Sequence, residues 1–280
     1  MENVPAKQLI KDNLNIPTLP KVLVRVGQLL DDPECGTRDI GEVVSRDAPL
    51  AARVLRIANS AFYGLRERCL STEAACSVLG LRVLRNVVMQ AAVIQRFEHL
   101  RNKGFDLDGM WRHSILTAQT SAFLARRSRR GLDLEPEEFH ACGLLHDIGK
   151  VVMLDSLGND YLECFNQART LGDRLHHAEQ RRFGFAHTDV GAMLAVRWGL
   201  PTAAVSAIQF HHGPLENLRD DPVAALVANA NLLAHRVADG DFVAAEATID
   251  QETADFLELE RRDVFEIVDF AAEALGQIEV

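Results

Sequence analysis

The sequence has no CxxC cysteine pair, no apolar run as long as a membrane span, and no alternating apolar and polar stretch long enough for a strand. Its five cysteines are odd in number and follow no secretory signal, which excludes a disulfide framework and favours reduced core residues. A span needs about 20 apolar residues, so we expect no membrane association. The short polar start shows no targeting segment, and together these absences predict a cytoplasmic protein.

Basic residues are also scarce. The chain has 30 Lys and Arg against 40 Asp and Glu, for a net charge of −10. Phosphate contacts need Lys and Arg, so this balance argues against nucleic-acid binding. One basic cluster, at 126–130, is interpreted as a solvated helix end that interacts with the helix dipole. With 280 residues, 48% of them hydrophobic, the chain can bury a sizeable core.

Apolar residues recur at helical spacing almost throughout, which predicts an all-α fold. Gly80 should close one helix, and the next should run from Leu81 to Phe97. The break at 102–109 suggests a domain boundary. The predicted parts are an N-terminal helical lobe at 1–104, a helical core at 105–240 and C-terminal helices at 241–280.

His146 and Asp147 stand side by side in an apolar run that continues into Gly149 and Lys150. A buried pair of this kind is costly to desolvate unless something compensates it. A divalent cation does so, because imidazole and carboxylate are both good ligands for first-row metals. On one continuous helix over 136–154 the two side chains would diverge by about 100°. Both then reach one site only in a groove that other helices complete.

Further histidines stand in contexts that suit metal binding. His113 lies on an otherwise apolar helix, His187 precedes a predicted cap at Thr188, and His211 and His212 occupy a helix C-terminus. A single helical histidine is more often a hydrogen-bonded structural residue. The prediction of a metal site therefore rests on the whole set of histidines. His176 and His177 lie in a charged segment and are interpreted as surface residues. Lys150 either contacts a substrate phosphate as a point charge or is an exposed helix lysine.

These residues match the HD superfamily of metal-dependent phosphohydrolases, and longer motifs resemble its HDOD branch. The resemblance covers roughly residues 16–237 and implies an N-terminal helical bundle with an HD-type helical core. It also implies a bacterial signalling or regulatory protein. Most members of the family have no established enzymatic activity. The matching segments are 16–20, 47–50, 55–64, 78–81, 84–88, 111–114, 143–150 and 198–201.

Carried over residue by residue, the resemblance places His113, His146 and Asp147 at the first three HD ligand positions. The fourth position, an Asp in the family, aligns with Asn231, whose neutral amide should lower the metal affinity. The related HD-GYP phosphodiesterases have further ligands, and the GYP motif itself is absent here. The residues that resemble those further positions are Lys150, His187, His211 and His212.

We therefore expect a bacterial signal-transduction module that acts through protein or ligand contacts without strong catalytic activity. The alternatives are a metal-dependent phosphohydrolase, such as a cyclic-dinucleotide phosphodiesterase with Lys150 as its phosphate contact, and a scaffold with an empty cleft. Expected partners are a signalling protein and a nucleotide ligand. The expected cofactor is a transition metal, iron first, with manganese, nickel or zinc as alternatives. The predicted metal ligands are His113, His146, Asp147, His187, His211 and His212.

One expectation concerns the N-terminal lobe. Asn59 and Ser60 stand just before the aromatic residues Phe62 and Tyr63. Asparagine and serine side chains compete with helical hydrogen bonds and often end helices. We predict that Asn59 ends its helix and ties the following loop to a neighbouring helix, which would hold the two lobes against each other. The alternative is a plain helix end.

Overall fold

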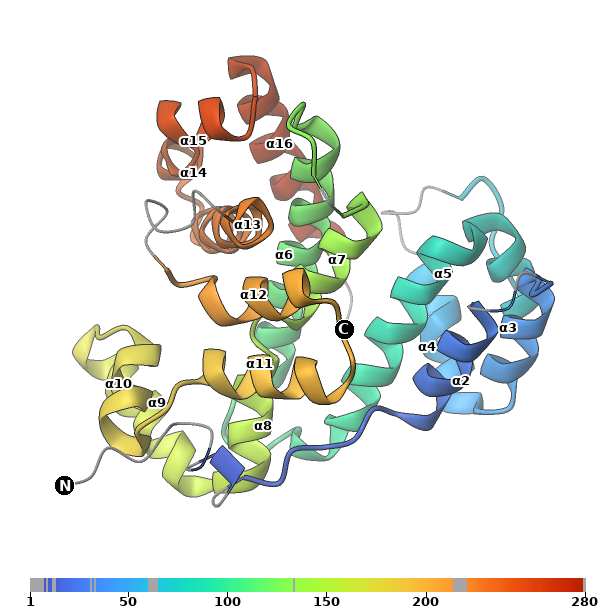
Figure 1. Cartoon of the computed structure of the whole chain (residues 1–280), viewed down its shortest axis with the longest axis horizontal. Coiled ribbons are helices and arrows are strands. Elements are labelled where there is room, and N and C mark those ends of the chain that lie inside the picture. The colour runs from blue at the N-terminus through green and yellow to red at the C-terminus, as the bar shows by residue number, and fades with distance from the viewer. Residues whose placement is uncertain are drawn as a thin grey trace. The chain divides into compact units, whose positions relative to one another are not determined.

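The computed structural model of the chain describes residues 8, 10–11, 14–30, 32, 34–59, 65–132, 134–213 and 221–278. Within these residues the regular structure is entirely helical, which confirms the predicted all-α fold (Figure 1). They form two compact units. The first holds the residues up to Thr18 and Leu100–Ala272, and the second holds Leu19–His99 and the residues from Glu273 onward. The predicted division at 1–104, 105–240 and 241–280 stays a prediction.

The second unit packs three short helices against one long one. Its core consists of aliphatic side chains from all four, such as Val26, Ile40, Val54 and Leu84. Asp47 caps the third helix by accepting a hydrogen bond from the Leu50 amide, with Pro49 in the first turn. The helices are α2 (Lys21–Leu30), α3 (Thr37–Ser45), α4 (Ala48–Ala58) and α5 (Thr72–Arg96), followed by the 3-10 turn η2 (Glu98–Leu100).

Helix α5 contains the break that the sequence predicts. Gly80 has φ 73° and ψ 166°, outside the helical region, so one helix ends there and a second begins at Leu81. By length and composition α5 could cross a membrane, which departs from the expected absence of so apolar a stretch. More than half of that stretch is buried in the protein, as in a core helix, and neither half of α5 alone reaches the ~20 residues of a span.

Asn59 ends α4, as predicted, and its amide joins two segments of the second unit. It donates to the Leu55 and Cys69 carbonyls, and it accepts from the Cys69 amide at 2.8 Å. The tie therefore runs to the stretch that leads into α5. All three bonds lie within the second unit, so a role between lobes stays a prediction. Residues 60–64 of the motif lie outside the described residues.

Replacing Asn59 by alanine should lower the melting temperature. The change removes the partner of the Cys69 amide and of the Cys69 carbonyl, while the Leu55 carbonyl keeps its bond from the backbone amide of residue 59. An unsatisfied buried group costs about 1–3 kcal/mol. For a protein of this size the expected fall is about 2–4 °C per kcal/mol in a thermal melt. The Asn59→Asp variant keeps an oxygen that accepts from the Cys69 amide, so its melting temperature should fall less. Equal melting curves for wild type and both variants would contradict the role.

The first unit carries the predicted metal ligands. Its N-terminal segment is held by Trp198, whose indole N–H donates to the Pro17 carbonyl at 3.1 Å. In Figure 1, α11 and α12 run side by side. The helices are α6 (Leu107–Arg127), α7 (Pro136–Leu145), α8 (Ile148–Leu157), α9 (Asn159–Leu171), α10 (Leu175–Phe183), α11 (His187–Arg197), α12 (Thr202–Phe210), α13 (Pro222–Ala238), α14 (Phe242–Thr248), α15 (Gln251–Phe256) and α16 (Arg261–Gln277), the last of which leaves the unit after Ala272.

The basic cluster at 126–130 contacts the acidic C-terminal helices. Arg129 pairs with Asp263 at 2.8 Å, and Arg130 donates to the Phe256 carbonyl at 3.1 Å. Arg127 pairs with Glu266 at 2.8 Å. These arginines therefore help to hold α15 and α16 onto the end of α6, where the sequence suggested a solvated helix end.

The five cysteines are free thiols. Four of them are buried and Cys35 is half-buried, as the sequence predicts for reduced core residues.

Candidate metal centre

The predicted helix over 136–154 is interrupted at the His-Asp pair, so the expectation of one continuous helix is wrong. Helix α7 ends at Leu145, α8 begins at Ile148, and Asp147 has φ −98° and ψ 8°. The His146 ring donates from Nδ1 to the Gly143 carbonyl at 2.7 Å, the acceptor that the Asp147 amide would use in a continuous helix. The break brings both side chains to one site.

The same local arrangement ends α12. The Nδ1 atom of His211 donates to the Ile208 carbonyl at 2.8 Å, again three residues back, and the helix stops. In both cases the bond holds the proton on Nδ1 and leaves Nε2 with a free lone pair. Burial lowers the pKa of His211 to about 3, which keeps this ring neutral and able to bind a metal.

Glycines let the helices that carry these ligands approach closely. A Cβ on Gly143 would lie 2.7 Å from the Cα of Ala118, so this glycine lets α7 lie against α6, the helix of His113. A Cβ on Gly149 would overlap the backbone carbonyl of His187 at the start of α11. The glycines beside the His-Asp pair are therefore needed for the site to assemble.

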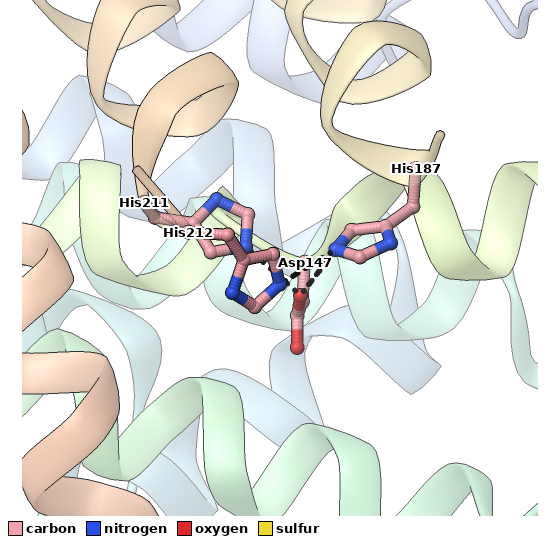
Figure 2. A group of neighbouring side chains, drawn as sticks. All are labelled: Asp147, His187, His211 and His212. Atoms are coloured by element: carbon pink, nitrogen blue, oxygen red, sulfur yellow. Dashed lines mark hydrogen bonds and ion pairs between the residues drawn. The ribbon is translucent and has the colours of Figure 1, made fainter. Parts of the chain in front are cut away.

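Five histidines converge on the carboxylate of Asp147, in two groups of potential metal ligands that share it. In the first group, His146 Nε2 lies 3.4 Å from Asp147 Oδ2 and 3.3 Å from His113 Nε2. In the second, the Nε2 atoms of His187 and His211 each lie 3.4 Å from Asp147 Oδ1 (Figure 2). His212 completes the second group, with its Nε2 3.1 Å from that of His187.

These spacings fit a metal ion. An ion about 2.0–2.1 Å from each ligand in a tetrahedral site holds its ligand atoms about 3.3–3.4 Å apart. Asp147 Oδ1 and His211 Nε2 are buried without a hydrogen-bond partner among the described residues, although only 3.4 Å separates them. Buried polar atoms rarely stay unpaired, and a cation between them would satisfy both. Imidazole with carboxylate suits a transition metal better than magnesium or calcium.

Lys150 supplies the positive charge that faces Asp147 in this structure. Its Nζ lies 2.6 Å from Asp147 Oδ2, and its side chain is mostly buried. Burial by itself would raise the pKa of Asp147, but Lys150 and His146 hold it well below the ordinary value. Of the two alternatives for Lys150, the structure therefore excludes an exposed helix lysine.

His187 begins α11, where the sequence placed it one residue before a cap at Thr188. The cap residue is Ala186, whose amide donates to the Asp189 carboxylate at 3.0 Å. The His187 ring is fully buried and donates from Nδ1 to Glu179 at 2.5 Å. Burial would lower the pKa of His187, but the Glu179 and Asp147 carboxylates raise it.

Asn231 lies at the first group, as the alignment placed it. Its Oδ1 is 2.9 Å from His113 Nε2, and the residue is buried. Next to it the structure adds a residue that the sequence reasoning missed. His235, one helical turn after Asn231 on α13, stacks on His113 with ring centroids 4.1 Å apart. That four-residue spacing was a usable signal, because it puts the two residues on one helix face.

His176 is a second residue whose position was mispredicted. It is half-buried and stacks on His212 with centroids 4.5 Å apart, so its assignment to the surface is wrong, whereas His177 is exposed as expected. Glu179, also missed, is the one buried residue of α10 among those described.

Residues 16–214 match the sequence profile of the HDOD domain, which covers well over half of the chain. This chain belongs to the HDOD domain family. Among solved structures, this HDOD protein is similar to an HDOD domain protein of unknown function from Geobacter sulfurreducens. That likeness has a TM-score of 0.78 at 23% identity and covers 97% of this chain and 95% of the other.

Two further structures share the fold. A provisionally named phosphohydrolase from Shewanella amazonensis SB2B gives a TM-score of 0.77 at 23% identity, with 99% of both chains covered. A provisionally named signal transduction protein from Marinobacter aquaeolei VT8 gives a TM-score of 0.75 at 24% identity, with 97% of this chain and 62% of the other covered. At these identities the likeness shows the fold alone.

A sequence relative is an uncharacterized protein of Treponema pallidum (strain Nichols), 28% identical over 231 residues. The match takes in 81% of this chain but 43% of that protein, so the chain spans less than half the length of this relative.

Proposed function

We propose that this HDOD protein is a bacterial signalling module that acts through protein or ligand contacts, without strong catalytic activity. The observation that carries the proposal is Asn231, a neutral amide 2.9 Å from His113 where the superfamily pattern has a carboxylate. The whole cluster thus has one carboxylate, Asp147, among five histidines. A phosphohydrolase needs anionic ligands to hold its metal ions firmly. A ligand set with one carboxylate therefore favours a module that binds a ligand or a partner over an enzyme that turns over a substrate. The name of the Marinobacter protein, a signal transduction protein, supports the proposed signalling function.

In this proposal a transition metal binds among His113, His146, Asp147, His187, His211 and His212, with iron as the expected metal and manganese, nickel or zinc as alternatives. The free thiols support a cytoplasmic location. A signalling protein is the proposed partner, and a nucleotide is a proposed ligand of the cleft.

One observation favours a second candidate, a metal-dependent phosphohydrolase that could act on cyclic dinucleotides. Asp147 presents one oxygen to each ligand group, an arrangement that can hold two metal ions a few ångströms apart. Bound ions of this kind acidify water and polarise a phosphoryl oxygen. Lys150 would then contact the substrate phosphate once a metal takes its place at Asp147. The name of the Shewanella protein supports this candidate.

Substitution of Asn231 by aspartate distinguishes the two functions. We expect the metal-loaded wild type to hydrolyse cyclic dinucleotides and bis-p-nitrophenyl phosphate no faster than a His146→Ala, Asp147→Ala variant. Asn231→Asp restores the anionic ligand beside His113 and should raise turnover above that background. The measurement is product formation after loading with iron, manganese or zinc.

Asn229→Asp, on the same helix and equally buried, is the matched control and should stay at background. Wild-type turnover approaching about 1 s⁻¹, the low end of ordinary enzymes, would overturn the proposal in favour of the phosphohydrolase.

A further inference from the structure

Helix α10 buries a carboxylate and little else. Its other residues are exposed or half-buried, yet the Glu179 side chain is fully buried. Charged residues are almost never fully buried unless they are paired, because desolvating the charge is expensive. The partners of Glu179 therefore indicate what it does.

Each oxygen of Glu179 has its own donor. Tyr161 on α9, also fully buried, donates its hydroxyl to Oε1 at 2.8 Å. His187 donates twice to Oε2, from its backbone amide at 2.9 Å and from Nδ1 at 2.5 Å. The tyrosine fixes the carboxylate, and the carboxylate fixes both the backbone and the ring of His187.

The bond to Nδ1 decides how His187 faces the cluster. With Nδ1 donating to Glu179, Nε2 is the nitrogen that faces the space shared with Asp147 Oδ1, 3.4 Å away, and His212 Nε2, 3.1 Å away. A carboxylate on the far nitrogen also makes an imidazole a stronger ligand and fixes its orientation. His146 and His211 have only a neutral backbone carbonyl at that position.

The two ligand groups are therefore unequal. The group of Asp147, His187, His211 and His212 has a ligand backed by a buried anion. The group of His113, His146 and Asp147 has the neutral amide of Asn231 beside it.

We infer that Glu179, held by Tyr161, is a positioning residue that makes the His187 end of the cluster the tighter of two metal positions. The inference rests on the metal-binding part of the proposed function. In this inference α9 and α10 supply the residues that raise the metal affinity of one position.

Cobalt(II) titration of the metal-free full chain tests the inference, because visible absorption reports cobalt in a nitrogen-rich tetrahedral site and requires no activity. Wild type should bind one cobalt tightly and a second weakly. Glu179→Gln keeps the shape and loses the charge, and it should weaken the tight phase about 10–100-fold. Tyr161→Phe should weaken the same phase less. Glu163→Gln, an exposed carboxylate on α9, should change nothing. Asn231→Asp should strengthen only the weak phase.

Several outcomes would overturn the inference. Wild-type affinity in Glu179→Gln would do so, and so would an equal loss in both phases, which a merely structural residue would cause. If Glu179→Gln does not fold, Tyr161→Phe decides in its place, and an unchanged tight phase there counts against the inference. A wild type that binds no cobalt overturns both this inference and the proposed metal site. Turnover in the Asn231 experiment bears on the proposed function alone.

Discussion

Replacing His146 and Asp147 together by alanine should remove the bound transition metal from the purified protein. Asp147 is the one residue that both ligand groups share, and it presents Oδ2 to one and Oδ1 to the other. His146 contributes an Nε2 lone pair to the first group. Loss of the only carboxylate in the cluster should therefore empty both positions, and elemental analysis should find metal in the wild type and background levels in the variant.

The matched control is His177→Ala with Asp269→Ala, the same two residue types at exposed positions of the first unit. Circular dichroism should show that both double variants remain helical, and Asp147→Asn offers a milder change of similar shape. Equal metal content in wild type and the His146, Asp147 variant would contradict the metal centre. The histidines would then be a hydrogen-bonded network around water, since the site is polar and buried.

The helical fold could be predicted because its signals are local. Gly80 ends a helix through its own backbone angles, and Asp47 caps α4 through its own side chain. Such signals can be read from a few neighbouring residues.

The break at His146 and Asp147 could not be predicted in this way. The His146 ring takes the Gly143 carbonyl through Nδ1, three residues back, while its Nε2 faces His113, 33 positions away in the chain. Helical periodicity continues through the break, because apolar residues stand on both sides of it. Tertiary contacts here override the local pattern.

The ligand set was accessible through motifs, but its supporting residues were not. Glu179 sits in a charged helix whose other residues are exposed or half-buried, and nothing local distinguishes it from them. Its role exists only because Tyr161 and His187 reach it from α9 and α11. The burial of His176 could not be predicted for the same reason, because its stacking partner His212 lies 36 positions away in the chain.

Replacing Lys150 by methionine should destabilise the metal-free protein far more than the metal-loaded protein. In this structure the Lys150 ammonium, 2.6 Å from Asp147 Oδ2, is the fixed positive charge that compensates a buried carboxylate. Removing one partner of a buried ion pair costs about 3–5 kcal/mol, because the other charge is left uncompensated. Protonation of a neighbouring histidine would offset part of this, so the value is an upper bound. A bound metal ion compensates Asp147 by itself, so the loaded form should lose little.

The experiment is urea unfolding of both proteins, once with chelator and once with saturating metal. We expect the metal-induced gain in unfolding free energy to be larger for Lys150→Met than for wild type, with the difference arising in the metal-free form. Lys103→Met, at an exposed position, should show the wild-type gain. An equal loss with and without metal would mean that Lys150 stabilises the fold independently of the metal. No loss in either form would mean that Lys150 is not the charge that compensates Asp147, which would contradict the prediction.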